Sequence, residues 1–148
     1  HYFAFTTREE IGNSGAQTVA QTLKPDYAIV LEATTASDIS GVSDEDRVCV
    51  QGKGAVVSFM DRSTVYNRDL FKGAFALAKE KNIPIQPKTT VAGGNDASAI
   101  HKACSGVYTI AVSLPCRYIH SGTSVGDKKD MQACYDLALA LSQEYANA

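Results

Sequence analysis

Apolar residues follow two patterns that alternate along the chain. Some short segments are apolar almost without a break, which is typical of strands buried on both faces of a parallel sheet. Other segments repeat small and apolar residues three or four positions apart, as along one face of a helix. Pro25 and Pro115 separate segments of the two kinds. The pattern therefore predicts strands that alternate with helices.

Five strands are expected from the apolar runs. Residues 2–6 form a buried first strand, and residues 26–32 form an interior strand of a sheet covered on both faces. Two more strands are expected at residues 55–60 and within residues 83–91. The last covers residues 107–114, where Pro115 ends the run.

Helical spacing predicts four helices, at residues 14–24, 68–82, about 96–102 and 128–144. Residues 33–54 form a long polar loop in which residues 48–50 add a short strand. Loops of this length in compact domains are often functional. Strands and helices alternate throughout, so the expected class is α/β with a mixed, mostly parallel sheet.

Composition narrows the classes of function. A hydrophobic share of 45% and a charged share of 20% over 148 residues are ordinary for one globular domain. The formal net charge is -2 and there is no basic run, so neither nucleic acid nor a membrane surface is an expected partner. No apolar stretch approaches the roughly 18 residues that cross a bilayer.

The four cysteines lie far apart, at positions 49, 104, 116 and 134, and none belongs to a C-x-x-C pair. This spacing fits neither a zinc cluster nor the disulfide framework of a small secreted protein. Free thiols in a reducing cytosol are expected, and with them a cytoplasmic location.

Side chains with catalytic or metal-binding chemistry follow the expected strands. Glu9 and Glu10 follow the first strand, and Glu32 ends the second. Asp96 follows a later strand and His120 follows residues 107–114. In open α/β sheets, sites usually lie where the carboxyl ends of the strands meet. Carboxylates with an imidazole suit Zn²⁺, Co²⁺ or Mn²⁺, and a spare carboxylate such as Glu9 suits a general base.

Each of these residues also has an ordinary structural interpretation. The Glu9–Glu10 pair by itself fits a solvated turn. Glu32 fits an ion pair or a helix cap, and His120 fits a loop histidine held by hydrogen bonds. Asp96 suits either a helix start, where an acid favours the helix dipole, or the orientation of a site group.

Five motifs follow one another along the chain: T-T-R-E-E-I-G-N-S-G-A, P-D-Y-A-I-V-L-E-A-T-T-A-S-D, I-P-I-Q, G-G-N-D-A and P-C-R-Y-I-H-S. In this order they resemble the tetrahedral-aminopeptidase family of co-catalytic metallopeptidases. That family includes glutamyl and deblocking aminopeptidases, and some members carry the label endoglucanase or cellulase. The resemblance implies a three-layer sandwich, as in zinc-dependent exopeptidases. It also implies an enzyme that hydrolyses N-terminal residues from peptides.

The resemblance assigns roles to single residues. Glu9 corresponds to the general base, and Glu10 and His120 correspond to ligands of one metal ion. Glu32 stands where the family places a carboxylate ligand of the other ion, which is often Asp. The implied cofactors are two divalent ions, zinc, cobalt or manganese, which would lie about 3.5–4 Å apart and activate a water molecule.

Part of the family's site is missing from this sequence. The family has a His-x-Asp and a bridging Asp in an Asp-Asp-Arg segment, both upstream of the Glu-Glu motif. Asp61-Arg62 lies downstream of it and does not substitute. Residues 1–148 are therefore expected to be the C-terminal portion of the catalytic domain, without the inserted dimerisation domain. We expect this portion to be inactive alone unless a companion chain supplies the missing ligands, and we expect the full-length parent to be a homo-oligomer.

Two other functions fit parts of the sequence. The chain fits a non-catalytic binding or assembly fragment that retains the fold. A glycosidase with Glu9 and Glu32 as paired carboxylates also fits. The second interpretation leaves Glu10 and His120 without a purpose, and the chain has no Trp to stack on a sugar.

Overall fold

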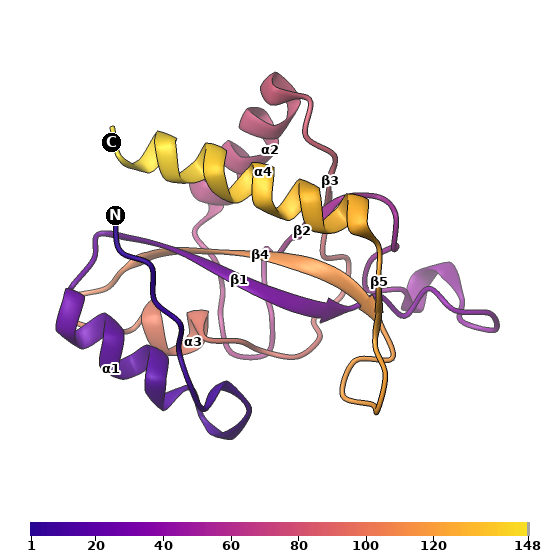
Figure 1. Cartoon of the computed structure of the whole chain (residues 1–148), viewed down its shortest axis with the longest axis horizontal. Coiled ribbons are helices and arrows are strands. Elements are labelled where there is room, and N and C mark those ends of the chain that lie inside the picture. The colour runs from indigo at the N-terminus through magenta and orange to yellow at the C-terminus, as the bar shows by residue number, and fades with distance from the viewer. Residues whose placement is uncertain (148) are drawn as a thin grey trace.

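The computed structural model describes residues 1–147, which form a five-stranded sheet with helices on both faces (Figure 1). In chain order the elements are the 3-10 helix η1 (Glu9–Ile11), α1 (Ser14–Leu23), β1 (Tyr27–Thr35), the 3-10 helix η2 (Asp44–Asp46), β2 (Ala55–Val57), α2 (Arg68–Lys81), β3 (Ile85–Pro87), α3 (Ala97–Ile100), β4 (Tyr108–Arg117), β5 (Val125–Gly126) and α4 (Lys128–Tyr145). Figure 1 shows α2 and α4 on one face of the sheet and α1 and α3 on the other. These three layers confirm the predicted α/β class.

The sheet is mixed, with the strand order β1-β4-β2-β3 and with β5 paired to β4. β1 and β4 run parallel along all nine residues of β1, and β2 is parallel to β3. The antiparallel pairings of β4 with β2 and with β5 cover only short stretches. Within the described residues β1 pairs with β4 alone, so β1 is an edge strand and the prediction of an interior strand was wrong.

β4 lies at the centre of the sheet and contributes to the cores on both of its faces. Ile110 and Val112 belong to the core beneath α2 and α4, which also contains Leu137 of α4. Ala111 between them packs with Val30 in a core on the opposite face. Successive side chains of a strand point to opposite faces. A strand covered on both faces is therefore apolar at most positions, and the polar residues within β4, Thr109 and Ser113, are small and buried.

The N-terminal segment, residues 1–8, forms no strand, which corrects the first of the strand predictions. Tyr2, Phe3 and Phe5 are exposed by 75%, 90% and 97%. In Figure 1 the segment starts near the C-terminal end of α4 and crosses the sheet toward η1. An apolar run becomes a buried strand only when a neighbouring strand and a covering layer are present. In the part of the chain that the structure describes, residues 1–8 have neither.

β4 continues through Pro115 and does not end there, contrary to the prediction. Along the edge of β4 opposite β1, β2 pairs with Val112 and Ser113, and β5 pairs with Cys116 and Arg117. Among residues 1–147 no pairing on that edge involves Pro115. A proline within a strand is tolerated where its missing N–H is not needed by a ladder.

The predicted strand at residues 48–50 is also absent. The N–H of Val50 donates to Gln86 Oε1, and the carbonyl of Val50 accepts from Gln86 Nε2, both at 2.8 Å. A side-chain amide thus occupies both backbone groups that a neighbouring strand would have used. Within residues 1–147 no helix is both long and apolar enough to cross a membrane.

Candidate functional site

Glu9 and Glu10 lie on a tight loop that packs against the start of α1. The loop is closed by two non-glycine residues in the left-handed region, Arg8 (φ 65°) and Asn13 (φ 59°), and the Asn13 N–H donates to the Arg8 carbonyl at 2.9 Å. A Cβ on Gly15 would lie 2.3 Å from the Thr7 carbonyl oxygen, so only glycine allows this approach. The short 3-10 turn η1 then presents both glutamates side by side.

Glu32 lies within β1, because the strand extends to Thr35 and does not end at Glu32 as predicted. Val30 packs in the core that contains Ala97, the first residue of α3. Side chains two residues apart in a strand share a face. Glu32 therefore faces the α1 and α3 side of the sheet, which is the side of Glu9 and Asp96.

His120 follows the end of β4 on a loop in which Tyr118 (φ 60°) and His120 (φ 62°) both adopt left-handed backbone. Such conformations are uncommon outside glycine and tend to occur at functional sites. The Nδ1 atom of His120 lies 3.5 Å from Glu10 Oε1, and both side chains are largely exposed. The predicted pair of Glu10 and His120 is therefore present in the structure.

Asp96 stands at the start of α3 but does not cap it with its side chain. The side chain of Asn95 caps the helix instead, because its Oδ1 accepts from the Ala97 N–H at 2.8 Å. The Asp96 carboxylate accepts hydrogen bonds from Thr6 Oγ1 at 2.5 Å and from Asn13 Nδ2 at 3.0 Å. Of the two roles considered from the sequence, the contacts favour the orientation of a site group.

Neighbouring carboxylates raise the pKa values of Glu9 and Glu32. Burial, followed by the charges of Glu9 and Asp96, raises the pKa of Glu32 to about 7. The pKa of Glu9 is also raised, first by burial and then by the charges of Glu10 and Asp96, while Asn13 and His120 act in the opposite direction. Glu9, Asp96 and Glu10 thus lie close enough to Glu32 to act on its pKa, and His120 lies beside Glu10. The sequence predicted that Glu10, Glu32 and His120 would gather at one edge of the sheet.

The donors in this region match a divalent cation in kind but do not complete a site. Carboxylates and an imidazole are ordinary ligands of Zn²⁺, and a cation would offset the accumulated negative charge. Glu10 and His120 supply two donors close together. Within residues 1–147, however, no three His, Cys, Asp or Glu side chains are arranged to hold a metal ion.

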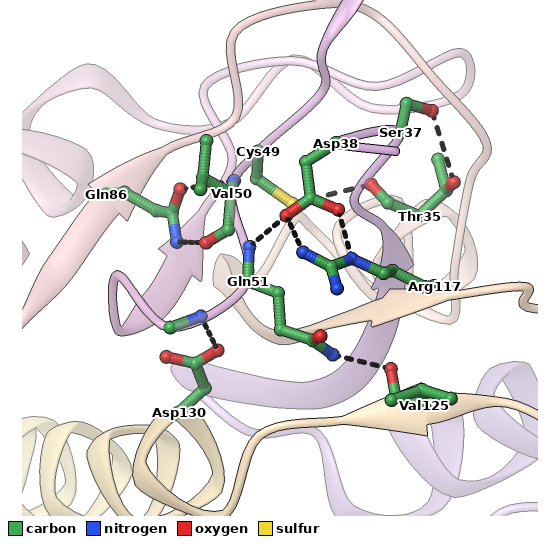
Figure 2. Close-up of polar contacts among 11 residues, drawn as sticks. Thr35, Ser37, Asp38, Cys49, Val50, Gln51, Gln86, Arg117, Val125 and Asp130 are labelled. Carbon is green, nitrogen blue, oxygen red and sulfur yellow. Dashed lines mark hydrogen bonds and ion pairs between the residues drawn. The ribbon is translucent and has the colours of Figure 1, made fainter. Parts of the chain in front are cut away.

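A second group of polar residues, which the sequence analysis did not identify, supports the loop that carries His120. Figure 2 shows the Arg117 guanidinium, at the end of β4, bound to both oxygens of Asp38, with Nε–Oδ1 at 2.7 Å and a second N–O contact at 2.9 Å. The backbone N–H of Gln51 also donates to Asp38 at 2.8 Å. In the sequence, Asp38 is one acid in a long loop and Arg117 stands three residues before His120. Neither position indicates that the two side chains pair.

Comparison with known proteins gives consistent matches. The family described as M42 glutamyl aminopeptidase matches residues 1–137. The lysyl aminopeptidase of Pyrococcus furiosus is 32% identical over 148 residues, an overlap that covers 97% of this chain and 40% of that protein.

Two solved structures show the same fold. An aminopeptidase from the archaeon Desulfurococcus kamchatkensis superimposes with a TM-score of 0.89 at 32% identity, over 92% of this chain and 39% of its own. The TET1 peptidase of Pyrococcus horikoshii superimposes with a TM-score of 0.75 at 31% identity, over 93% of this chain and 39% of its own. The chain therefore spans about two fifths of the length of these relatives.

Proposed function

The chain belongs to the M42 glutamyl aminopeptidase family, and we propose that it forms the C-terminal portion of the catalytic domain of a metal-dependent aminopeptidase. The relatives it matches are aminopeptidases that are more than twice as long. In this proposal the remaining metal ligands come from the other part of the catalytic domain or from a companion chain.

In this proposal Glu10 and His120 hold one divalent ion and Glu32 is a ligand of a second. The single observation that carries the proposal is the convergence of Glu9, Glu10, Glu32 and His120 from three segments that are distant in sequence. Zinc or cobalt, with manganese as a further option, suits these donors. Bound divalent ions supply Lewis-acid activation of water and of the peptide carbonyl.

Glu9 is the proposed general base. It accepts a proton from the attacking water and passes it to the amine that leaves when the N-terminal peptide bond breaks. Its raised pKa suits this task, because a base works best when its pKa lies close to the working pH. Glu10, and not Glu9, contacts His120, so Glu9 is available to act as the base. Glu9 is partly buried, whereas Glu10 is exposed.

The test is Glu9→Gln in the full-length protein, assayed on a panel of aminoacyl-anilides with and without chelator. We expect wild-type activity to disappear with chelator, and Glu9→Gln to retain two equivalents of metal while kcat falls by about 10²–10⁴-fold. Glu80→Gln, on the exposed surface of α2, is the control and should match wild type. Normal peptide cleavage by metal-loaded Glu9→Gln would refute the role of Glu9. Release of reducing sugar from a β-glucan by metal-free protein would support a glycosidase instead.

We also propose that the full-length protein is a cytoplasmic homo-oligomer that acts on peptides. Pyrococcus horikoshii TET1 peptidase is described as assembling into a tetrahedron or a large octahedral shell. Light scattering on the full-length protein should therefore give a mass several times that of one chain. A monomer would contradict this part of the proposal and leave the assignment of the site unaffected.

A further inference from the structure

The side-chain amide of Asn13 lies between the carboxylates of Glu9 and Asp96. Its Nδ2 donates to Asp96 Oδ1 at 3.0 Å and approaches Glu9 Oε1 at 3.4 Å. Its Oδ1 accepts from Ser98 Oγ at 3.3 Å. This pattern defines the orientation of the amide, because a flipped amide would turn its oxygen toward two carboxylates.

Asp96 is buried, with 5% of its surface exposed, and both of its oxygens are occupied. Oδ1 accepts from Asn13, and Oδ2 accepts from Thr6 on the segment that precedes η1. A buried carboxylate close to Glu9 and Glu32 is unfavourable for folding by itself, since like charges repel. Helix capping does not account for Asp96 either, because Asn95 binds the first helical N–H.

Asn13 is also fixed through its backbone. It occupies the left-handed region, where Asn is one of the few residues tolerated, and its N–H donates to the Arg8 carbonyl at 2.9 Å. The loop of residues 8–13 is therefore closed by the same residue whose side chain contacts Glu9. The loop therefore fixes the Asn13 amide relative to the backbone of Glu9.

We propose that Asn13 and Asp96 are positioning residues for Glu9: Asp96 holds the Asn13 amide, and this amide holds the Glu9 carboxylate in the orientation in which it receives a proton. This inference rests on the proposed role of Glu9 as general base. Neither Asn13 nor Asp96 contacts the reacting atoms in this scheme. Both act by fixing a group that does.

The test compares Asp96→Asn, Asn13→Asp and the double variant that exchanges the two side chains. Asn13→Asp removes the hydrogen bond between positions 13 and 96, because two carboxylates then face each other. Asp96→Asn weakens it, because a neutral amide–amide bond replaces a bond to a carboxylate. The double variant restores this bond in the reverse direction, and it leaves an acceptor for Thr6 and an acceptor for Ser98. Glu9, however, then meets a carboxylate where the Asn13 amide had been.

Positioning and a merely structural role therefore predict different outcomes for the double variant. We expect the thermal midpoint to fall in both single variants and to return to within about 2 °C of wild type in the double variant. We expect kcat on an aminoacyl-anilide to remain about 10–100-fold below wild type in all three variants. KM and the metal content, measured by elemental analysis, should stay as in wild type. Recovery of kcat together with the thermal midpoint would overturn the proposal, and so would loss of metal in Asp96→Asn.

Asn67→Ala is the matched control, because the Asn67 amide also makes side-chain hydrogen bonds, to the first N–H groups of α2. It should lower the thermal midpoint without lowering kcat. Glu9→Gln, measured in parallel, distinguishes a failure of the positioning proposal from a failure of the proposed function. If Glu9→Gln is inactive and Asp96→Asn has wild-type kcat, only the positioning proposal fails. If Glu9→Gln is fully active, the proposed function fails and the positioning proposal with it.

Discussion

Two acidic side chains in this protein differ in pKa because their surroundings differ. The Arg117 guanidinium lowers the pKa of Asp38 by binding both of its oxygens, and the Gln51 N–H contributes in the same direction. Within residues 1–147 Glu32 forms no ion pair, and its pKa is set by other causes. Burial, together with the charges of Glu9 and Asp96, raises it to about 7. The first carboxylate is therefore ionised in the fold, and the second is poised between its two states near neutral pH.

Asp38→Asn should lower the free energy of unfolding by about 2–3 kcal/mol, because charged hydrogen bonds to Arg117 and Gln51 are lost. Since the pKa of Asp38 is lowered from 3.8, its contribution is present above about pH 4 and is lost as the pH falls through its folded-state pKa. Urea unfolding at pH 7 and pH 3 measures both statements. Asp44→Asn is the control, because Asp44 pairs with Arg47 on the surface and should contribute less than about 1 kcal/mol. Equal losses for the two variants at pH 7 would contradict the prediction.

Glu32→Gln should stabilise the metal-free protein at pH 8 but not at pH 5. A carboxyl whose folded-state pKa is raised above 4.5 favours folding at low pH, and this advantage is lost between pH 4.5 and about 7. Above that window the ionised carboxylate destabilises the fold, and the amide removes this cost. We expect the thermal midpoint at pH 8 to rise by about 2–4 °C relative to wild type. Glu45→Gln on the exposed η2 serves as the control, and an equal gain at both pH values would refute the explanation.

At the scale of elements, the long loop between β1 and β2 is fastened to the sheet and to α4 at several points. Asp130 in the first turn of α4 is fully buried and accepts from the N–H groups of Gly52 and Gly54, both at 2.6 Å. Gln86 of β3 binds the backbone of Val50, and Asp38 binds Gln51 (Figure 2). These side chains replace the ladder bonds that a regular strand would have made. The loop thereby acquires a defined path without secondary structure.

Gly54→Ala and Gly73→Ala should change stability in opposite directions. Gly54 has φ 95°, and a Cβ there would lie 2.0 Å from the Pro84 carbonyl oxygen, so we expect a loss of about 3 kcal/mol or more. Gly73 lies in α2, where a Cβ meets nothing within 4 Å, so alanine should stabilise by about 0.5–1 kcal/mol. Chemical denaturation of the two variants measures both effects. A loss of stability in Gly73→Ala would show that the helix does not tolerate the extra methyl group.

At the scale of the whole molecule, helices cover the two faces of the sheet but not its edge strand β1 or the N-terminal segment. β1 has a single neighbour among the described residues. Tyr2, Phe3 and Phe5 of the N-terminal segment are exposed. Large exposed apolar patches are typical of surfaces that take part in interactions. This agrees with the proposal that the catalytic domain includes a further portion.

The double substitution Phe3→Ser/Phe5→Ser should reduce self-association of the chain alone but destabilise the full-length protein. In the chain alone it should reduce self-association, measured by sedimentation velocity, because it removes exposed apolar surface. In the full-length protein it should lower the thermal midpoint, because these side chains would then be buried. Met131→Ser, on the exposed side of α4, is the control for general surface hydrophobicity. Unchanged stability of the full-length variant would contradict burial of the segment.

Local patterns in the sequence determined the class of the fold, the positions of α1, α2 and α4, and the run that became β4. They did so because periodicity reports which faces of an element are buried. They also predicted that Glu10, Glu32 and His120 would gather at one edge of the sheet, since strand ends in an α/β sheet share an edge. The structure instead carries Glu10 on a loop that follows no strand, and Glu32 within β1. The family resemblance assigned the roles of these residues, and those roles remain predictions.

Only the tertiary structure decided features that depend on the neighbours of a segment. Residues 2–5 are apolar but form no strand, because no described strand pairs with them. Pro115 stays within β4, because the pairings on one edge avoid it. Asn13 joins Asp96 to Glu9, and Arg117 binds Asp38, across large separations in sequence. Hydrogen bonds between distant residues leave no periodic trace, so a single sequence identifies the chemical groups but not their partners.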